Sequence, residues 1–225
     1  MNRKVISIIG IGFLFLMIHS CKSHPEKGLL DRYFNALSLN DLQTLSTMAM
    51  NPAEIDFRSW EIIEVTEEVT EEFKLPEMDQ KIKELKKRVD ESVSKTLETR
   101  DELDDAKYDL ERARTRANRE KVDQLQAEYD ELYEQTKKLQ KEYNEARAAA
   151  DDEERMAKFS LGGDYTAIRQ FTGNDHKKNV DIQVITEDGV EEKYRVFMHK
   201  YVLTDPTTNI THNGRWIIDR FRRLN

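Results

Sequence analysis

The sequence predicts an α+β protein: a small cone-like antiparallel sheet with N-terminal helices, interrupted by a long antiparallel coiled-coil hairpin. Two observations predict this fold. No glycine or proline occurs between Pro76 and Gly162, and apolar runs with the alternation of β-strands lie on both sides of that stretch. Composition adds a third, because 36% of the 225 residues are charged and only 38% are hydrophobic. Such a chain is too polar for one large core, so a small core with a polar helical arm is expected.

The first 20 residues have the pattern of an export signal. Arg3 and Lys4 precede a mostly apolar run of 14 residues from Val5 to Ile18. A helix needs about 20 apolar residues to span a bilayer, so this run is too short for a permanent transmembrane anchor. A basic start, a short apolar segment and a small residue at its end are typical of a cleaved signal peptide. We therefore expect residues 1–20 to be a signal peptide.

The only cysteine stands where the apolar run ends. The segment Ile18-His19-Ser20-Cys21 resembles the lipobox of bacterial prolipoproteins. The resemblance implies that the signal is cleaved before Cys21, that this cysteine is acylated, and that residues 21–26 form a lipidated tether. Lys22 follows the cysteine, which favours the periplasmic face of the outer membrane over the inner membrane in that family. The alternative is an ordinary cleaved signal that leaves one free cysteine.

Residues 74–158 have the composition and the spacing of a coiled coil. Between Glu77 and Lys158 there are 24 acidic and 19 basic residues, with no helix breaker. Two apolar series repeat with alternating steps of three and four residues, which predicts a helical seam. These series are Leu85, Val89, Ser92, Thr96, Thr99, Leu103, Ala106, Leu110 and Ala113, then Val122, Leu125, Tyr129, Leu132, Thr136, Leu139, Tyr143, Ala146 and Ala150.

The two series mirror one another about a midpoint near Ala117. Folding there places Ser92 opposite Tyr143 and Thr96 opposite Leu139, so that large residues mostly face small ones. The turn is expected over residues 114–118, where Asn118 tolerates a left-handed conformation. A hairpin of this length has arms of roughly 60 Å. The alternative is a single rod of roughly 125 Å, which could dimerise.

The flanks, residues 27–73 and 159–225, are expected to form one split α+β domain. Gly162-Gly163 can end the second arm through a left-handed cap. The predicted elements are a helix over Leu29–Leu37, a short helix capped by Asn40-Asp41, a strand over Phe57–Val65, alternating strands at Val180–Val184 and Tyr194–Met198, and a closing segment from Arg215 to Phe221 after a turn at Asn213-Gly214.

These flanks resemble the nuclear transport factor 2-like, cystatin-like α+β cone found in small bacterial lipoproteins. The resemblance rests on the opening helix with Leu39-Asn40-Asp41-Leu42, on the Phe57–Val65 strand, and on the closing Asn213-Gly214-Arg215-Trp216-Ile217-Ile218-Asp219. Members of that family include enzymes and pure binding modules, so the resemblance implies a fold without selecting a function. The coiled-coil insertion departs from the usual form of the family.

No catalytic, metal or cofactor site is predicted. The strand positions expected to face inward carry no acid; they are Val180, Ile182, Val184, Tyr194, Val196 and Met198. His176, in a polar segment read as a loop over residues 173–179, is far in sequence from His199 and His212, unlike the ligands of compact zinc motifs. A net charge of −8 also argues against nucleic acid as a partner.

The strongest candidate for binding is a group of four arginines that would crowd the hairpin tip: Arg112, Arg114, Arg116 and Arg119. Guanidinium groups form paired hydrogen bonds with phosphate or carboxylate, so an envelope protein, a cell-wall polymer or anionic lipid is a suitable partner. The alternative is a solvated turn that balances the acidic residues nearby. The segment Asp151–Glu154, at the base of the arm, is interpreted as a solvated acidic face.

Together these features predict a non-enzymatic bacterial envelope lipoprotein whose hairpin is an interaction or spacer arm. The membrane is the expected partner through the acyl anchor, and an envelope or cell-wall partner is expected at the tip. One alternative is a cone that binds or transforms a small ligand. A further alternative is a periplasmic transport adaptor, a class that also combines lipid anchors with helical hairpins.

Overall fold

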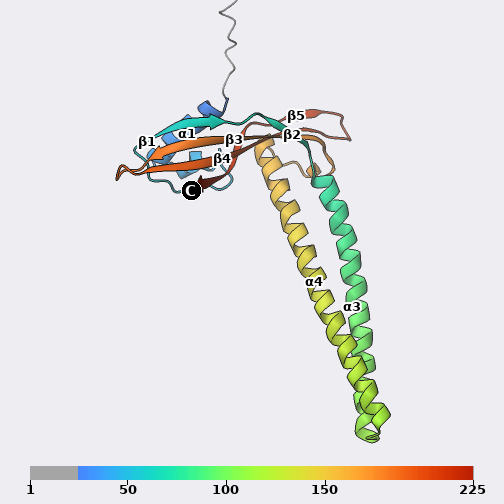
Figure 1. The fold of residues 1–225 in the computed structure, drawn as a ribbon. Helices are drawn as coiled ribbons and strands as arrows, with labels where there is room; N and C mark the ends of the chain where they lie inside the picture. The colour runs from blue at the N-terminus through green and yellow to red at the C-terminus, as the bar shows by residue number, and fades with distance from the viewer. Residues whose placement is uncertain (1–24, 225) are drawn as a thin grey trace, which may run out of the picture.

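The computed structural model describes residues 25–224, and it is an α+β protein with a curled antiparallel half-barrel sheet and a long helical hairpin (Figure 1). The elements in chain order are α1 (Pro25–Ser38), α2 (Leu42–Leu45), β1 (Ser59–Val65), β2 (Val69–Glu72), α3 (Leu75–Arg112), α4 (Arg116–Leu161), the 3₁₀ helix η1 (Ile168–Gln170), β3 (Thr172–Ile185), β4 (Glu191–Thr204), β5 (Thr211–Asn213) and β6 (Ile217–Leu224).

The centre of the sheet is the antiparallel hairpin of β3 and β4. Its register is unbroken from the pair Thr172–Thr204 to the pair Ile185–Glu191. β1 and β2 pair in succession along the outer edge of β3, and β6 and β5 do the same along β4. The sheet therefore combines strands that precede the helical hairpin in the chain with strands that follow it.

The half of the sheet formed by β1, β6 and the ends of β3 and β4 that pair with them packs against the N-terminal helices. Val180, Ile182 and Val196 are fully buried there, together with Leu30 and Tyr33 of α1. The Phe34 ring stacks on Trp60 with 4.7 Å between ring centroids. Of the six positions predicted to face inward, five are fully buried in this core, and Tyr194 packs at its edge. This core occupies one face of the sheet.

The other half of the sheet packs against the base of the hairpin. Tyr201 and Leu203 of β4 are fully buried with Leu75 of α3 and Ala157 of α4. Side chains alternate between the two faces of a strand, and the odd-numbered Tyr201 and Leu203 point away from the face that carries Val196. The hairpin base and α1 therefore lie on opposite faces of the sheet, as Figure 1 shows.

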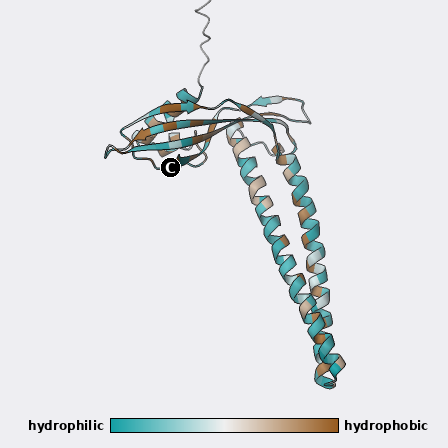
Figure 2. Ribbon diagram, viewed as in Figure 1, coloured by the Kyte–Doolittle hydropathy of each residue, from teal (hydrophilic) through white to brown (hydrophobic). Residues whose placement is uncertain are grey.

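α3 and α4 pack along the seam that the sequence predicts. Every member of the two predicted series is buried or half-buried, except Ala113, which is exposed in the turn. The outer surfaces of both helices are mostly hydrophilic (Figure 2). With 38 and 46 residues, the helices are about 57 and 69 Å long at 1.5 Å per residue. α4 ends as predicted, with Gly162 in the left-handed region at φ 72°.

The predicted turn and register of the hairpin are wrong. The turn comprises Ala113–Thr115, so its centre is Arg114 instead of Ala117. Thr136 therefore contacts both Ser92 and Thr96, which were expected opposite Tyr143 and Leu139. Matching large residues of one series with small residues of the other indicated the wrong alignment, because neighbouring heptad registers offer similar pairings.

The predicted polar loop over residues 173–179 is also wrong, because this segment belongs to β3. Asp175, His176 and Lys177 pair in turn with Tyr201, Lys200 and His199 of β4. Both neighbouring strands supply backbone partners, so the polar side chains do not prevent strand formation. His212 lies in the short strand β5.

Candidate interaction surface at the hairpin tip and its base

The turn at the tip is held by side-chain hydrogen bonds. The Thr115 hydroxyl caps α4 by accepting from the Asn118 amide at 3.2 Å. The Asn118 side-chain amide donates to the Ala113 carbonyl oxygen at 2.7 Å, which satisfies a backbone acceptor after the end of α3. Asn118 was expected in a left-handed conformation, but it lies inside α4 and stabilises the turn through its side chain.

The four tip arginines differ in their contacts: two interact with side chains of their own helix, and the other two line a surface hollow. Arg112 lies over the Tyr108 ring of its own helix, 5.7 Å from the ring centroid. Arg116 donates to Glu120 one turn along α4 at 2.7 Å. Arg114 and Arg119 line one surface hollow of about 480 Å³ together with Lys107, Leu110 and Glu111.

The charge of the tip is opposite to that of the chain. Between Lys107 and Lys121 there are six basic and three acidic residues, whereas the chain has a formal charge of −8. Within the described residues, neither Arg114 nor Arg119 forms an ion pair, so both guanidinium groups can meet an external anion. Chemically, the tip is suited to a phosphate or carboxylate partner.

The base of the hairpin is fastened by one arginine. Arg169 of η1 donates to Asp79 of α3 at 2.6 Å, and to Asp151 at 2.5 Å and Glu154 at 2.6 Å on α4. Partial burial acts to lower the pKa of Arg169, but the three carboxylates outweigh it and the pKa is raised. The guanidinium group therefore joins both arms of the hairpin to the segment that leads into β3.

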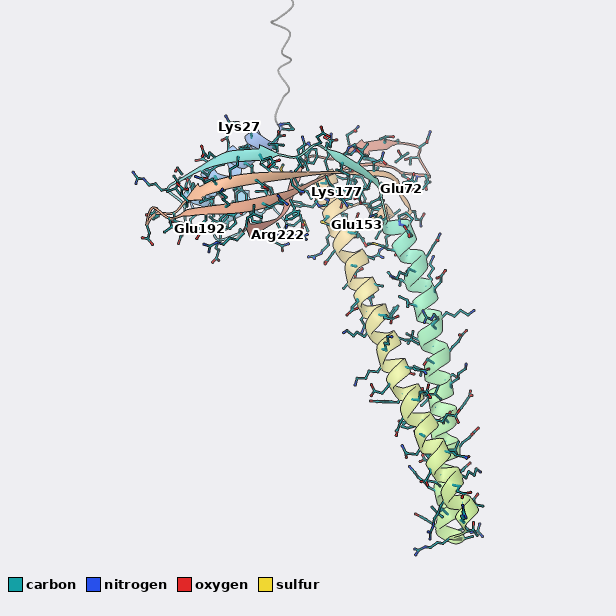
Figure 3. All side chains as sticks on the ribbon, in the orientation of Figure 1. Lys27, Glu72, Glu153, Lys177, Glu192 and Arg222 are labelled. Atoms are coloured by element: carbon teal, nitrogen blue, oxygen red, sulfur yellow. The ribbon has the colours of Figure 1, made fainter. Side chains whose placement is uncertain are left out.

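A second polar cluster lies where α4 meets the sheet. Asp175 of β3 is 3% exposed, and the Nδ1 atom of His199 lies 3.0 Å from its carboxylate. The Lys177 ammonium group lies 3.4 Å from the same carboxylate. Figure 3 shows Lys177 and Glu153 at this joint between the sheet and α4. Burial and the charge of Asp175 raise the pKa of Glu153.

Tyr201 completes this cluster from β4. Its buried hydroxyl lies within electrostatic reach of Glu153 but forms no hydrogen bond of normal geometry with a described residue. Burial, and then the charge of Glu153, raise the pKa of Tyr201. The prediction of a solvated acidic face over Asp151–Glu154 is therefore wrong for Glu153 and Glu154, which are half-buried and contact the sheet and η1.

The three histidines of the sheet have separate environments. The Nδ1 atom of His176 lies 2.8 Å from Glu68, whereas His199 pairs with Asp175, and His212 stacks on Phe171 with 5.8 Å between centroids. Within residues 25–224, no group of three or more His, Cys, Asp or Glu side chains is arranged to hold a metal ion. The cluster around Asp175 was missed from sequence because its segment was read as a loop. An antiparallel pairing of β3 and β4 would have brought residues 175 and 201 together.

The predicted acylation site, Cys21, and the signal peptide lie outside the described residues. Among the described helices, none is long and apolar enough to cross a membrane. Comparison of the chain with protein families, curated proteins and solved structures finds no match.

Proposed function

We propose that this protein is a lipid-anchored envelope protein whose helical hairpin holds a basic tip away from the membrane to bind an anionic envelope partner. One observation carries the proposal: α1, the first described element after the proposed anchor, lies on the opposite face of the sheet from the hairpin base. Only three residues separate Cys21 from Pro25, the first residue of α1. An anchor at Cys21 therefore places α1 toward the bilayer and the hairpin away from it.

The contacts at the base support a rigid arm. Arg169 joins both helices to η1, and Glu153 of α4 lies within electrostatic reach of the Asp175 cluster on the sheet. A fixed base holds the tip at a defined distance of about 60 Å from the sheet. The side chains expected to line a ligand-binding cone, such as Val180 and Ile182, pack against α1 instead. This packing favours an interaction arm over the small-ligand alternative.

The partner is tested by photo-crosslinking in living cells. A photo-reactive residue replaces Thr115 at the tip, and the matched control places it at Lys138 on the exposed surface of the same hairpin. We expect one specific adduct with an anionic envelope protein or cell-wall polymer from position 115 and none from position 138. The same adducts from both positions would contradict tip-specific binding.

The anchor is tested separately with Cys21→Ser. If acylation anchors the protein, this variant is released from the membrane fraction, while the parent chain remains and has an intact mass increased by its acyl groups. A variant that stays in the membrane fraction would refute acylation as the anchor.

A further inference from the structure

The face of the sheet that carries α1 also carries a pocket of about 390 Å³ beside the start of that helix. Pro25 and Leu29 of α1, Met48 and Trp216 supply apolar and aromatic surface. The remaining lining residues are Arg32, Thr44, Thr47, Lys200, Gly214 and Arg215. The described lining thus contains three cations and no acid.

The three cationic side chains of this pocket differ in the contacts that they make. Arg32 is exposed, and its Nε atom donates only to the carbonyl oxygen of Gly28, at 3.2 Å. Lys200 forms no ion pair within the described residues. Arg215 is held against α4, with its guanidinium group 5.2 Å from the centroid of the Phe159 ring. Arg32 and Lys200 are therefore the two groups most available to a ligand.

Two neighbouring charged groups are already paired. Lys178 lies 5.3 Å from the centroid of the Trp216 ring and 3.5 Å from the Glu26 carboxylate. The Asp41 carboxylate accepts from the Thr44 amide at 3.0 Å and from its hydroxyl at 2.5 Å. The lining of the pocket is therefore positively charged, although the whole protein is acidic. Its cationic side chains can bind an anion.

From this lining we infer that the pocket binds the phosphate group of an anionic phospholipid in the membrane to which the protein is anchored. The inference rests on the proposed function for the position of the membrane. Pro25 itself lines the pocket, and the four peptide steps from Cys21 to Pro25 span at most about 14 Å. The anchor therefore holds this face within reach of lipid headgroups. Arg32 and Lys200 contact the phosphate, and the apolar wall formed by Leu29 and Met48 accommodates the glycerol backbone.

The inference predicts which lipid is captured by a photo-reactive residue at Thr47 in the pocket. The full chain is reconstituted into vesicles of phosphatidylcholine with and without phosphatidylglycerol. We expect an adduct with phosphatidylglycerol about 25-fold above that with phosphatidylcholine per mole of lipid, because two cations contribute about fivefold each near an anionic headgroup and the choline group of phosphatidylcholine neutralises its own phosphate. Position 193, on the opposite face of the sheet, should give no adduct. Equal yields from the two lipids would overturn the inference.

Charge-neutralising variants identify the residues. Arg32→Gln or Lys200→Gln should reduce the phosphatidylglycerol adduct about fivefold, whereas the matched variant Arg222→Gln removes a charge from the opposite face and should leave it unchanged. Equal losses from all three variants would show a general charge effect and overturn the claim that the lipid binds in the pocket. Soluble glycerol phosphate at the concentration of the lipid should not block the adduct. Complete protection would assign the site to a free phosphate ester and overturn the membrane assignment.

The intact mass of the same preparation reports acylation of Cys21 independently. A chain that carries no acyl group but gives the phosphatidylglycerol adduct would refute acylation as the anchor and support lipid binding in the pocket. An acylated chain without the adduct would refute lipid binding in the pocket and support acylation as the anchor.

Discussion

The hydroxyl oxygens of Ser92 and Thr136 lie 2.6 Å apart across the seam of the hairpin. The Thr96 hydroxyl lies 2.9 Å from the same Thr136 oxygen and donates to the Ser92 carbonyl oxygen at 2.8 Å. These three side chains form a polar layer between Val89 and Leu103, which are both buried. A polar layer of this kind fixes the register of two helices because a shifted alignment would leave its hydroxyls without partners.

Thr136→Val should lower the free energy of unfolding by about 1 kcal/mol, because it leaves the Ser92 and Thr96 hydroxyls without their shared partner. Replacing the whole layer, with Ser92→Ala, Thr96→Val and Thr136→Val, should restore most of that loss. Urea unfolding followed by circular dichroism measures both effects. The matched control is Ser94→Ala, which removes an exposed hydroxyl from the same helix and should change stability by less than about 0.5 kcal/mol. A triple variant less stable than Thr136→Val would contradict this account.

Arg169→Gln should destabilise the base of the hairpin by about 2 kcal/mol, because it removes charged hydrogen bonds and leaves Asp79, Asp151 and Glu154 facing one another. Added salt should recover part of the loss by screening the carboxylates. Arg155→Gln is the matched control, because Arg155 pairs with Asp152 on the exposed surface of α4. Its effect should remain below about 0.5 kcal/mol in thermal unfolding. Equal effects from the two variants would refute a special role for Arg169.

Glu71 should contribute to stability at neutral pH and lose that contribution in acid. Hydrogen bonds from Lys177, and then from Lys74, lower the pKa of Glu71 from 4.5 to about 2. A depressed pKa means that the unfolded chain binds the proton first, so this stabilisation is complete above about pH 4.5 and is lost as the pH falls toward 2. Because the side chain is 37% exposed, its contribution is about 1 kcal/mol or less.

Glu71→Gln should therefore lower stability at pH 7 and have a much smaller effect near pH 2, as measured by urea unfolding across this range. Glu67→Gln on the neighbouring exposed segment serves as the control. A pH-independent effect of Glu71→Gln would show that the loss comes from packing instead of charge.

Glu153 should have the opposite pH dependence. Burial raises its pKa, so the folded state holds the proton more tightly than the unfolded chain. Its stabilisation by protonation is present below the unfolded pKa and is lost as the pH rises through the folded pKa. Glu153→Gln should raise the free energy of unfolding at pH 7 and leave it nearly unchanged in acid, measured by thermal unfolding at each pH. A variant that is less stable at pH 7 would show that the carboxylate makes a favourable contact that outweighs its burial.

Charge reversal at the tip should weaken recovery of the partner. Arg114→Glu with Arg119→Glu places two acids in the hollow that we propose meets an anion, and should lower the yield of the position 115 adduct at least tenfold. Lys138→Glu with Arg147→Glu changes the charge equally at exposed positions along the arm and should leave the yield unchanged. Circular dichroism should show the parent helix content in both variants. An equal loss from the two pairs would assign the effect to net charge.

The sequence predicts the large elements well because their signals are strong and local. A stretch of 85 residues without glycine or proline indicates helix regardless of context, and Gly162 marks its end. The turn at Arg114 was missed because Asn118 acts through its side chain. The strand that contains Asp175 was missed because its segment is polar, and because Asp175 is buried near Glu153 of α4, which comes from a distant part of the chain. Elements defined by tertiary contacts carry little local signal.

The same arrangement bears on the order in which the chain folds. β2 pairs with β3 between Glu72 and Asn174, partners about 100 residues apart in the chain. A flexible loop of that length costs about 2 kcal/mol more to close than one of ten residues. The helical hairpin forms from contacts between near neighbours around Arg114, and its zipping brings residues 75 and 161 to the same end. The helical hairpin, which separates the two parts of the sheet in the sequence, thus brings these parts together in space. Assembly of the sheet should therefore follow formation of the hairpin.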